Sequence, residues 1–438
     1  MLNRCERPIG IIASPLEGAT LLDWVIAVFL VIVQQNAFAA TFFELLHPGD
    51  SLPGVDNVFN TASILISIIL LAIGASRVLP RLRTLFLRNP YVILYMVIAL
   101  SSAIWSLHSD LTIRRGCAYV LTIGVAGYIA VRFTTEQALQ VLARSFEICA
   151  VCSVIFILLY PDIGITHVGE YGAVELEGNW RGIYPHKNVF GFAMAVAVFV
   201  QLLLIALSSK RSVGAYAWAI FYFVLIVLSK STTALLISMS YFFILAIFTI
   251  WTRNKLIGYN ILFLAISATA LLFVASFLDA GSFLGLIGKD PTLTGRTDIW
   301  SAVIELIYEK PVLGWGYRAM WVPTDLVTMW VDKKTGEWGV PSAHNAFLEI
   351  TLELGLLGLI ALLLMMCHAF WRGIRCCFVD LLPLGLFSLV FYVSATIAGQ
   401  TIETLGINQE IDWLVFNILS FIAGERLASF LPQELYET

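Results

Sequence analysis

Long apolar runs recur from one end of the chain to the other, separated by short polar segments. A helix needs about 20 apolar residues to cross the hydrocarbon core of a bilayer, and these runs have that length. About twelve transmembrane segments are predicted, near residues 21–43, 59–76, 91–107, 112–131, 139–160, 188–207, 215–229, 232–251, 256–278, 346–370, 380–399 and 409–428. The pattern predicts an all-α polytopic membrane protein, with a single membrane domain over residues 1–438.

The composition agrees with this pattern and excludes an ordinary soluble domain. Hydrophobic residues make up 59% of the chain, charged residues only 13%, and the mean hydropathy is +0.87. A soluble domain keeps about a quarter of its residues charged. No cleavable signal peptide is predicted, because the run 21–43 is too long for a signal core. The seven cysteines lie outside long polar loops, so we expect no disulfide framework.

The placement of the basic residues predicts the orientation of the chain. Short cytoplasmic loops of membrane proteins are enriched in Lys and Arg. When the N terminus is placed in the cytoplasm, most of the 26 basic residues fall in loops on that side. Both termini are therefore expected in the cytoplasm, and the long loop 279–345, between the ninth and tenth helices, on the outer face.

Part of this long loop is expected to fold. Within 298–310 the apolar positions recur at helical spacing, which predicts an amphipathic helix lying along the membrane surface. Thr294 or Thr297 can cap its start, and Pro311 ends it. The segment Gly314-Trp315-Gly316-Tyr317 predicts a turn with aromatic rings at the membrane interface.

Polar residues gather in four clusters that are predicted to lie on the outer face. The clusters are Trp105–Asp110 with Arg114 and Arg115, Asn179–Asn188, Gly295–Trp300, and Pro341–Asn345, with Lys230 at the same level. Arginine carries a permanent charge and a planar fork that matches phosphate oxygens. The second and fourth clusters open helices, whose free backbone N–H groups favour anions. These features predict a site for a lipid-linked diphosphate, with Arg181 and Arg296 as the strongest candidates.

Simpler interpretations stay open for several of these residues. Basic side chains near a membrane surface can extend to lipid headgroups or pair with acidic loops, and we favour this for Arg114, Lys289, Lys333 and Lys334. His344 can take a proton from a sugar hydroxyl, or can merely cap the following helix. The chain has no Gly-rich phosphate loop, no His-Glu-x-x-His and no Asp-x-Asp pair, so neither a soluble nucleotide donor nor zinc chemistry is supported.

The order and spacing of these clusters resemble a known family. The motifs are Arg-Gly-x-Tyr-x-His-Lys-Asn at 181–188, Gly-Arg-Thr-Asp-Ile-Trp at 295–300, Gly-Trp-Gly-Tyr at 314–317 and His-Asn at 344–345. Together they resemble the O-antigen ligase and polysaccharide polymerase superfamily, and within it the ExoQ-type exopolysaccharide polymerases. The resemblance covers nearly the whole chain, since twelve helices with a large outer loop before the tenth are the family plan.

The resemblance implies a GT-C-like, metal-independent inverting glycosyltransferase without a cofactor, in the inner (cytoplasmic) membrane of a bacterium with its active face periplasmic. Its donor would be an oligosaccharide on undecaprenyl diphosphate. Arginines that match Arg181 and Arg296 would bind the diphosphate, and His344 would activate the acceptor hydroxyl. Further candidates for the diphosphate are Arg115, Lys187 and Lys230, and candidates for other substrate contacts are His186, Asn188 and Asn345. Membrane lipids are expected partners, other polysaccharide assembly proteins are candidate partners, and nucleic acid is not expected.

Three functions are compatible with this pattern. The leading hypothesis is a polymerase that moves a growing chain onto a new lipid-linked repeat unit. A ligase that moves the finished glycan onto lipid A-core or another acceptor would handle the same donor, so the motifs do not separate the two. A transporter or flippase is less favoured, because the charges crowd one face and the two halves show no obvious similarity.

Overall fold

The computed structural model describes residues 18–38, 41, 45, 58–166, 178–208, 213–254, 257, 296–322, 325–336, 340, 342–379, 381–400, 405–407 and 410–429. The regular elements within these residues are helices, and the β-type pairing found there is an isolated bridge between Ile165 and Trp180. The predicted all-α class is therefore confirmed for the described part of the chain.

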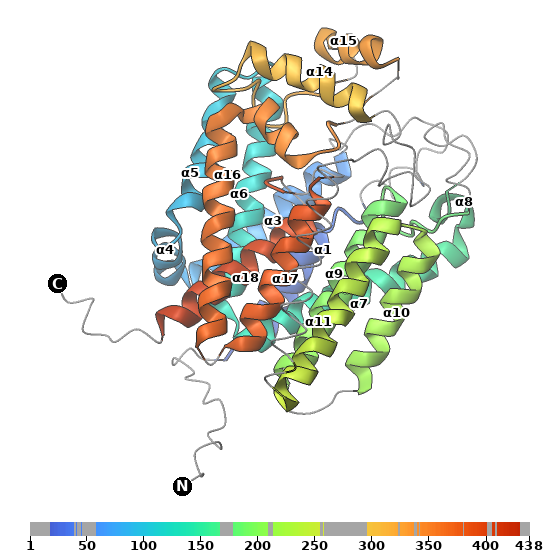
Figure 1. Ribbon diagram of the computed structural model, residues 1–438, viewed down its shortest axis with the longest axis vertical. Helices are drawn as coiled ribbons and strands as arrows, with labels where there is room; N and C mark the ends of the chain where they lie inside the picture. The colour runs from blue at the N-terminus through green and yellow to red at the C-terminus, as the bar shows by residue number, and fades with distance from the viewer. Residues whose placement is uncertain are drawn as a thin grey trace, which may run out of the picture.

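The described helices follow one another through mostly short connections (Figure 1). In chain order they are α1 (Leu21–Val33), α3 (Val58–Ser76), α4 (Leu79–Leu87), α5 (Pro90–Ser101), the 3₁₀ helix η1 (Ser102–Ile104), α6 (Ser109–Arg132), α7 (Thr135–Leu159), α8 (Pro161–Gly164), α9 (Lys187–Leu207), α10 (Val213–Ser229), α11 (Thr232–Arg253), α14 (Arg296–Glu309), α15 (Leu326–Thr335), α16 (Ala346–Phe378), α17 (Leu382–Ala398) and α18 (Ile411–Ala428).

The chain is a polytopic membrane protein by the length and composition of these helices. Among the described residues, α7, α9, α11 and α16 are long and apolar enough to cross a membrane, and α3 with α4 forms a fifth span if this pair, bent by 98°, is taken together. The helices α1, α10 and α17, and α5 together with η1, are apolar but shorter. The number of about twelve spans, and the side on which each loop lies, stay predictions.

Most predicted spans coincide with a helix, with two exceptions, and one predicted loop is helical. The segment 256–278 lies outside the described residues, apart from Ile257. The predicted helix 21–43 is wrong in its length, because α1 ends at Val33 and Gln34–Asn36 form a turn. The Arg-containing loop after α3 is a further helix, α4, whose Pro80 supports the new helical start that follows the bend.

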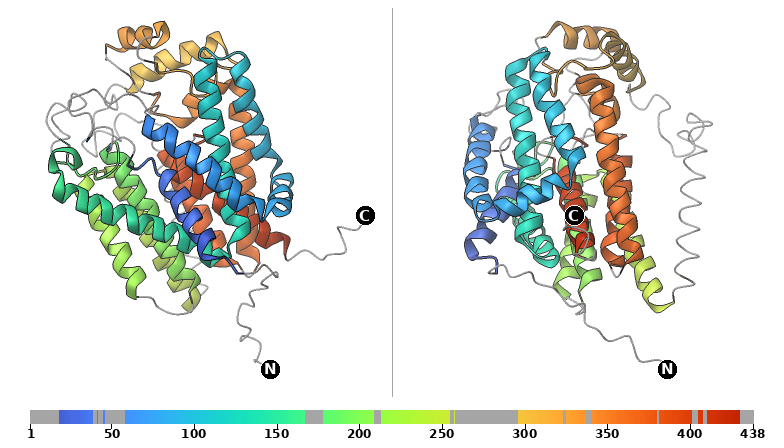
Figure 2. Two further views of the ribbon diagram at one scale, coloured as in Figure 1. Left: turned by 180° about the vertical axis from the view of Figure 1, so that it is seen from behind. Right: turned by 90° about the vertical axis from the view of Figure 1, so that its left-hand side faces the viewer.

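The bundle is organised around α9 and α18, whose side chains are buried along most of their length. Helix α9 contacts α7, α10, α11, α17 and α18, whereas α18 also contacts α6 and α16. Figures 1 and 2 show α14 and α15 lying across one end of the bundle, opposite the end at which α18 finishes. The helices α14 and α15 form a capping layer at this end, and the turn that starts α16 contacts it.

Helix α16 is broken at Gly355, where φ is +62° and ψ is −165°. The break leaves backbone groups without their helical partners, and the segment 311–316 supplies replacements. These bonds run from the Trp315 N–H to the Leu352 carbonyl (3.0 Å), from the Gly316 N–H to the Glu353 carbonyl (2.8 Å) and from the Leu356 N–H to the Pro311 carbonyl (2.9 Å). The end of α14 is thus tied by main-chain hydrogen bonds to the middle of α16.

The turn predicted at 314–317 is present, and its aromatic rings contact the protein. Gly314 and Gly316 have φ values of +67° and +109°. Tyr317 is fully buried and its hydroxyl donates to the Gly406 carbonyl at 3.2 Å. The indole N–H of Trp315 donates to the Leu306 carbonyl at 3.0 Å, so this ring packs against α14. The position of the turn at a membrane interface stays a prediction.

The predicted helix at 298–310 is confirmed as α14, although its environment differs from the prediction. Ile299 and Val303 are buried in a cluster that includes residues of α15 and of the segment before α16. Ile304 and Tyr308, predicted on the same apolar stripe, are exposed. Thr297 lies inside the helix rather than at its cap, and Pro311 follows its end as predicted. The protein itself therefore covers much of the apolar face.

A substitution at the break tests its importance. Only glycine adopts the φ and ψ of Gly355 without strain, and a Cβ there would collide with the Val312 carbonyl. We expect Gly355→Ala to lower the free energy of unfolding by about 1–3 kcal/mol or more, because strain and collision add. Thermal unfolding of the detergent-solubilised protein measures this. Gly18→Ala is the matched control, since an added Cβ there meets nothing within 4 Å, and equal midpoints for the two variants would contradict the prediction.

Candidate functional site

Arg181 is held in a buried segment that leads into α9. Its backbone N–H and that of Gly182 both donate to the Gly164 carbonyl at 3.0 Å. Gly182 has a φ of +58°, and a Cβ there would collide with Ser153 of α7, so glycine lets the segment approach that helix. The Arg181 side chain is only 2% exposed, and its Nη1 donates to the Pro185 carbonyl at 3.3 Å. A guanidinium is thus fixed below the surface, three residues before fully buried Tyr184.

His186 caps the start of α9. The Asn188 backbone N–H donates to its Nδ1 at 3.1 Å, which requires an unprotonated Nδ1. Burial, followed by the nearby positive charges of Lys187 and Arg181 and a contribution from His344, lowers the pKa of His186 to about 4. At neutral pH this imidazole is therefore uncharged, and it serves the helix as a hydrogen-bond acceptor.

His344 lies in the turn that starts α16. Its φ is +49°, a conformation that L-residues rarely adopt, and its Nδ1 is 3.3 Å from the Ser342 hydroxyl. The next residue, Asn345, caps the helix, because its Oδ1 accepts the backbone N–H groups of Phe347 (3.0 Å) and Leu348 (3.2 Å). The side chain of His344 is partly exposed, whereas the turn around it is buried.

The starts of α9 and α16 interact electrostatically. His344, like Arg181 and Lys187, contributes to the lowered pKa of His186. His186 at the start of α9, beside Arg181 and Lys187, is thus within electrostatic range of His344 at the start of α16, more than 150 positions later in the sequence. Both N-termini carry partial positive charge, which adds to that of the side chains. The combination suits a negatively charged ligand.

Helix α14, which carries Arg296, contacts the His344 turn. The indole N–H of Trp300 donates at 2.9 Å to the carbonyl of Ala343, the residue before His344. Arg296 is one helical turn before Trp300, and residues four apart share a helix face. Arg296 is thus carried on the side of α14 that touches the His344 turn.

Two comparisons with known proteins bear on this arrangement. A family model described as O-antigen ligase matches residues 217–363, which include α14, α15 and the start of α16. The chain is also 26% identical over 295 residues to the exopolysaccharide production protein ExoQ of Rhizobium meliloti (strain 1021). That alignment covers 65% of this chain and 65% of ExoQ, just under two thirds of the relative's length.

The chain is similar to O-antigen ligases and to ExoQ. The family resemblance predicted from the motifs is confirmed, and the two matches support an enzymatic role in general. The family match contains Arg296 and His344, whereas Arg181 precedes it.

The other predicted diphosphate ligands of this ExoQ-like chain contact different segments. Lys187 is the first residue of α9. Lys230, in the turn between α10 and α11, lies beside Gly178, and the Trp180 N–H donates to the nearby Leu228 carbonyl at 3.2 Å. Arg115 of α6 instead donates to the Arg318 carbonyl, in the segment that follows α14. Lys187 and Lys230 therefore border the Arg181 segment, and Arg115 binds the capping layer.

Sequence reasoning assigned no role to four acidic residues that the structure buries. Asp23 of α1 is fully buried, as are Glu349 and Glu353, which lie one turn apart on α16, and Asp412 lies at the start of α18 with 5% exposure. A signal was available, because a carboxylate within an apolar membrane helix is costly and commonly has a specific role. None of the described His, Cys, Asp and Glu side chains form a group of three or more that could hold a metal ion.

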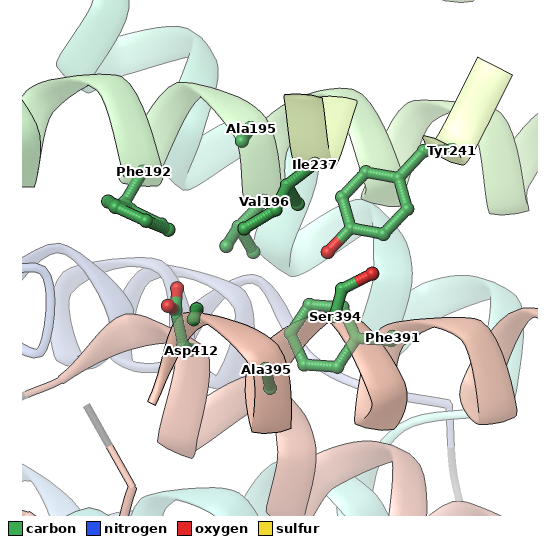
Figure 3. A pocket seen from close by; sticks show the side chains of 10 residues that line it. Phe192, Ala195, Val196, Ile237, Tyr241, Phe391, Ser394, Ala395 and Asp412 are labelled. Atoms are coloured by element: carbon green, nitrogen blue, oxygen red, sulfur yellow. The ribbon is translucent and has the colours of Figure 1, made fainter. Parts of the chain in front are cut away.

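Asp412 borders a small cavity between α9, α11, α17 and α18. Figure 3 shows its carboxylate beside Phe192, with the hydroxyls of Tyr241 and Ser394 close to each other. The cavity measures about 10 Å³, room for at most one water molecule. It is far too small for a saccharide. A larger hollow of about 350 Å³ is lined by Trp105 and residues 310–314, at the end of α14.

The low pKa of His186 predicts a specific pH dependence of stability. In the unfolded chain the histidine pKa is near 6.5, whereas in the folded protein the pKa of His186 is about 4. Between these two pH values the unfolded state therefore binds a proton that the folded state does not bind. Stability is therefore lost as the pH falls from 6.5 to 4, by up to about 3 kcal/mol from this residue.

The variant His186→Asn isolates this contribution. Asparagine is a good N-cap and does not titrate, so the helix cap is kept. We expect a smaller fall in the thermal unfolding midpoint between pH 6.5 and 4 than for the unmodified protein. Parallel curves for the two proteins would contradict the assignment.

Proposed function

We propose that this protein polymerises undecaprenyl-diphosphate-linked oligosaccharide repeat units at the periplasmic face of the bacterial inner membrane. The reaction is a metal-independent, inverting glycosyl transfer in which the growing chain moves from its lipid diphosphate onto a new lipid-linked unit. One observation carries the proposal: the start of α9, with buried Arg181 just before it, lies within electrostatic range of the His344 turn at the start of α16. The name of ExoQ, an exopolysaccharide production protein, supports a polymer-forming role.

In this mechanism the acceptor hydroxyl attacks the anomeric carbon while the bond from that carbon to the diphosphate oxygen breaks. The electron pair leaves with the diphosphate, and Arg181 and Arg296 stabilise its charge where it develops. The N-termini of α9 and α16 add to this stabilisation. His344 takes the proton of the acceptor hydroxyl. Attack on the face opposite the leaving group inverts the configuration of the anomeric carbon.

The other predicted residues have supporting roles in the proposal. Lys187 and Lys230 add positive charge beside the Arg181 segment, and Arg115 does so from the side of the capping layer. His186, which is uncharged at neutral pH, can contact substrate without adding to the charge. Asn188 and Asn345, at the first turns of α9 and α16, are the proposed ligands for sugar hydroxyls.

Reconstitution tests the reaction class and Arg296 together. Purified protein is incubated with synthetic undecaprenyl-diphosphate repeat units, without added metal, and chain growth is followed. We expect Arg296→Ala to reduce the rate by at least about 100-fold, the typical effect of removing one transition-state donor. Lys333→Ala is the matched control, because this exposed cation lies on the neighbouring helix α15. Full-length polymer from Arg296→Ala at the normal rate would remove Arg296 from the mechanism.

A ligase is the second candidate, favoured by the match to the O-antigen ligase family model. It would transfer a finished glycan to lipid A-core or another acceptor. A deletion strain separates the two functions. Lipid-linked products of single-repeat size are expected if the polymerase is missing, and accumulation of long lipid-linked chains would instead assign the protein as a ligase.

A further inference from the structure

Ala343, the residue before His344, is held through both of its backbone polar groups. The Ala343 N–H donates to Glu349 Oε2 at 2.8 Å, and the Ala343 carbonyl accepts the indole N–H of Trp300 at 2.9 Å. Ala343 and Glu349 are both fully buried. The two partners come from different elements, because Glu349 lies in the first turn of α16 and Trp300 on α14. The orientation of the two peptide units that flank the Ala343 Cα is therefore set by side chains that are themselves fixed by packing.

The second oxygen of Glu349 is also engaged. Its Oε1 accepts the indole N–H of Trp321 at 2.5 Å. Trp321 belongs to the segment that follows α14, and its φ of +60° is as unusual as that of His344. One carboxylate thus accepts two N–H groups from two strained segments. A backbone conformation of this kind persists only where the surroundings over-determine it.

We infer that Glu349 is a positioning residue for the proposed glycosyl transfer, which fixes His344 by accepting the Ala343 N–H while Trp321 holds its other oxygen. The inference rests on the proposed function of His344. Glu349 does not act as the base, because both of its oxygens accept hydrogen bonds from buried protein groups. It acts through the backbone of the turn, so that the imidazole is presented to the acceptor hydroxyl in one orientation.

The chemistry of a carboxylate explains why glutamate is needed here. A carboxylate accepts at both oxygens, whereas the amide of glutamine accepts at one end and donates at the other. In Glu349→Gln the amide NH₂ must face either the Ala343 N–H or the Trp321 N–H, which leaves two donors in contact. The size and shape of the side chain are nearly unchanged. The variant therefore disturbs the hydrogen bonds while retaining the packing.

The first test measures kcat and KM in the reconstituted reaction. We expect Glu349→Gln to lower kcat by about 10–100-fold with little change in KM, because misplacing a reacting group by about 1 Å can cost that much. The pH profile keeps its shape, since the titrating group is unchanged. The control Glu305→Gln removes an exposed carboxylate of α14 and should leave kcat unaltered. Normal kcat in Glu349→Gln would overturn the inference.

A second substitution distinguishes positioning from general destabilisation. Trp321→Phe removes the indole donor, so that in the double variant Glu349→Gln/Trp321→Phe the amide oxygen is free to accept the Ala343 N–H. We expect the double variant to be more active than Glu349→Gln alone. If Glu349 merely supports the fold, the two losses add, and the double variant would be the less active one.

Hydrogen exchange provides a readout that does not depend on the reaction. We expect faster amide exchange over 342–348 in Glu349→Gln, and slower exchange again in the double variant. If this pattern appears but the unmodified protein extends no lipid-linked unit, the proposed function fails and the positioning contact stands. If exchange in this segment is the same in all variants, the positioning role of Glu349 is refuted whatever the activity.

Discussion

The break in α16 at Gly355 is the constraint on which the arrangement of the site depends. A continuous helix would satisfy its own carbonyl and N–H groups, and nothing would hold the segment 311–316 against it. The break exposes these groups, and an unpaired backbone group buried away from water is costly, so the segment that leaves α14 is bound there. Because α14 is anchored at this end, its other end is directed to the His344 turn, where Trp300 binds the Ala343 carbonyl.

Charge imposes the second constraint. A buried guanidinium such as that of Arg181 would be unfavourable in an apolar surrounding unless polar groups compensate it. Here the Pro185 carbonyl accepts one of its N–H groups, and the neighbouring His186 stays neutral at physiological pH. A charged His186 would repel Arg181 and Lys187 and would also lose the capping bond from Asn188. Neutral His186 thus lets a fixed cation and a helix N-terminus coexist, which is the environment that a diphosphate would require.

Much of the helical architecture could be predicted from the sequence, because membrane helices need long apolar runs whatever their partners are. Arg181, Arg296 and His344 could be selected as well, since charged residues beside glycines and helix starts are unusual in so apolar a chain. The electrostatic proximity of the His344 turn to the start of α9 was expected only from the family resemblance. It depends on which helices pack together, and the local pattern around each residue contains no information about that.

The features that escaped prediction are those set by tertiary contacts. Gly355 lies in an apolar run that predicts one continuous helix, and only the approach of 311–316 explains its conformation. The burial of Tyr317 against Gly406 was not predicted, because the apolar character of the Gly314–Tyr317 rings suits a membrane interface equally well. Glu349 was overlooked because its two donors, Ala343 and Trp321, lie 6 and 28 positions away along the chain.

The strained turns of this protein show how the capping layer and the site depend on each other. His344 and Trp321 both adopt positive φ, and such conformations cost free energy that other contacts must offset. Glu349 offsets both at once, since one desolvated carboxylate accepts a hydrogen bond from Trp321 itself and another from the residue before His344. If the segment after α14 moved away, the carboxylate would lose one donor and keep a buried charge with fewer partners, which is unfavourable. The bound position of the segment after α14 and the orientation of the His344 turn are therefore coupled through Glu349. Any ligand that stabilises one of them also stabilises the other.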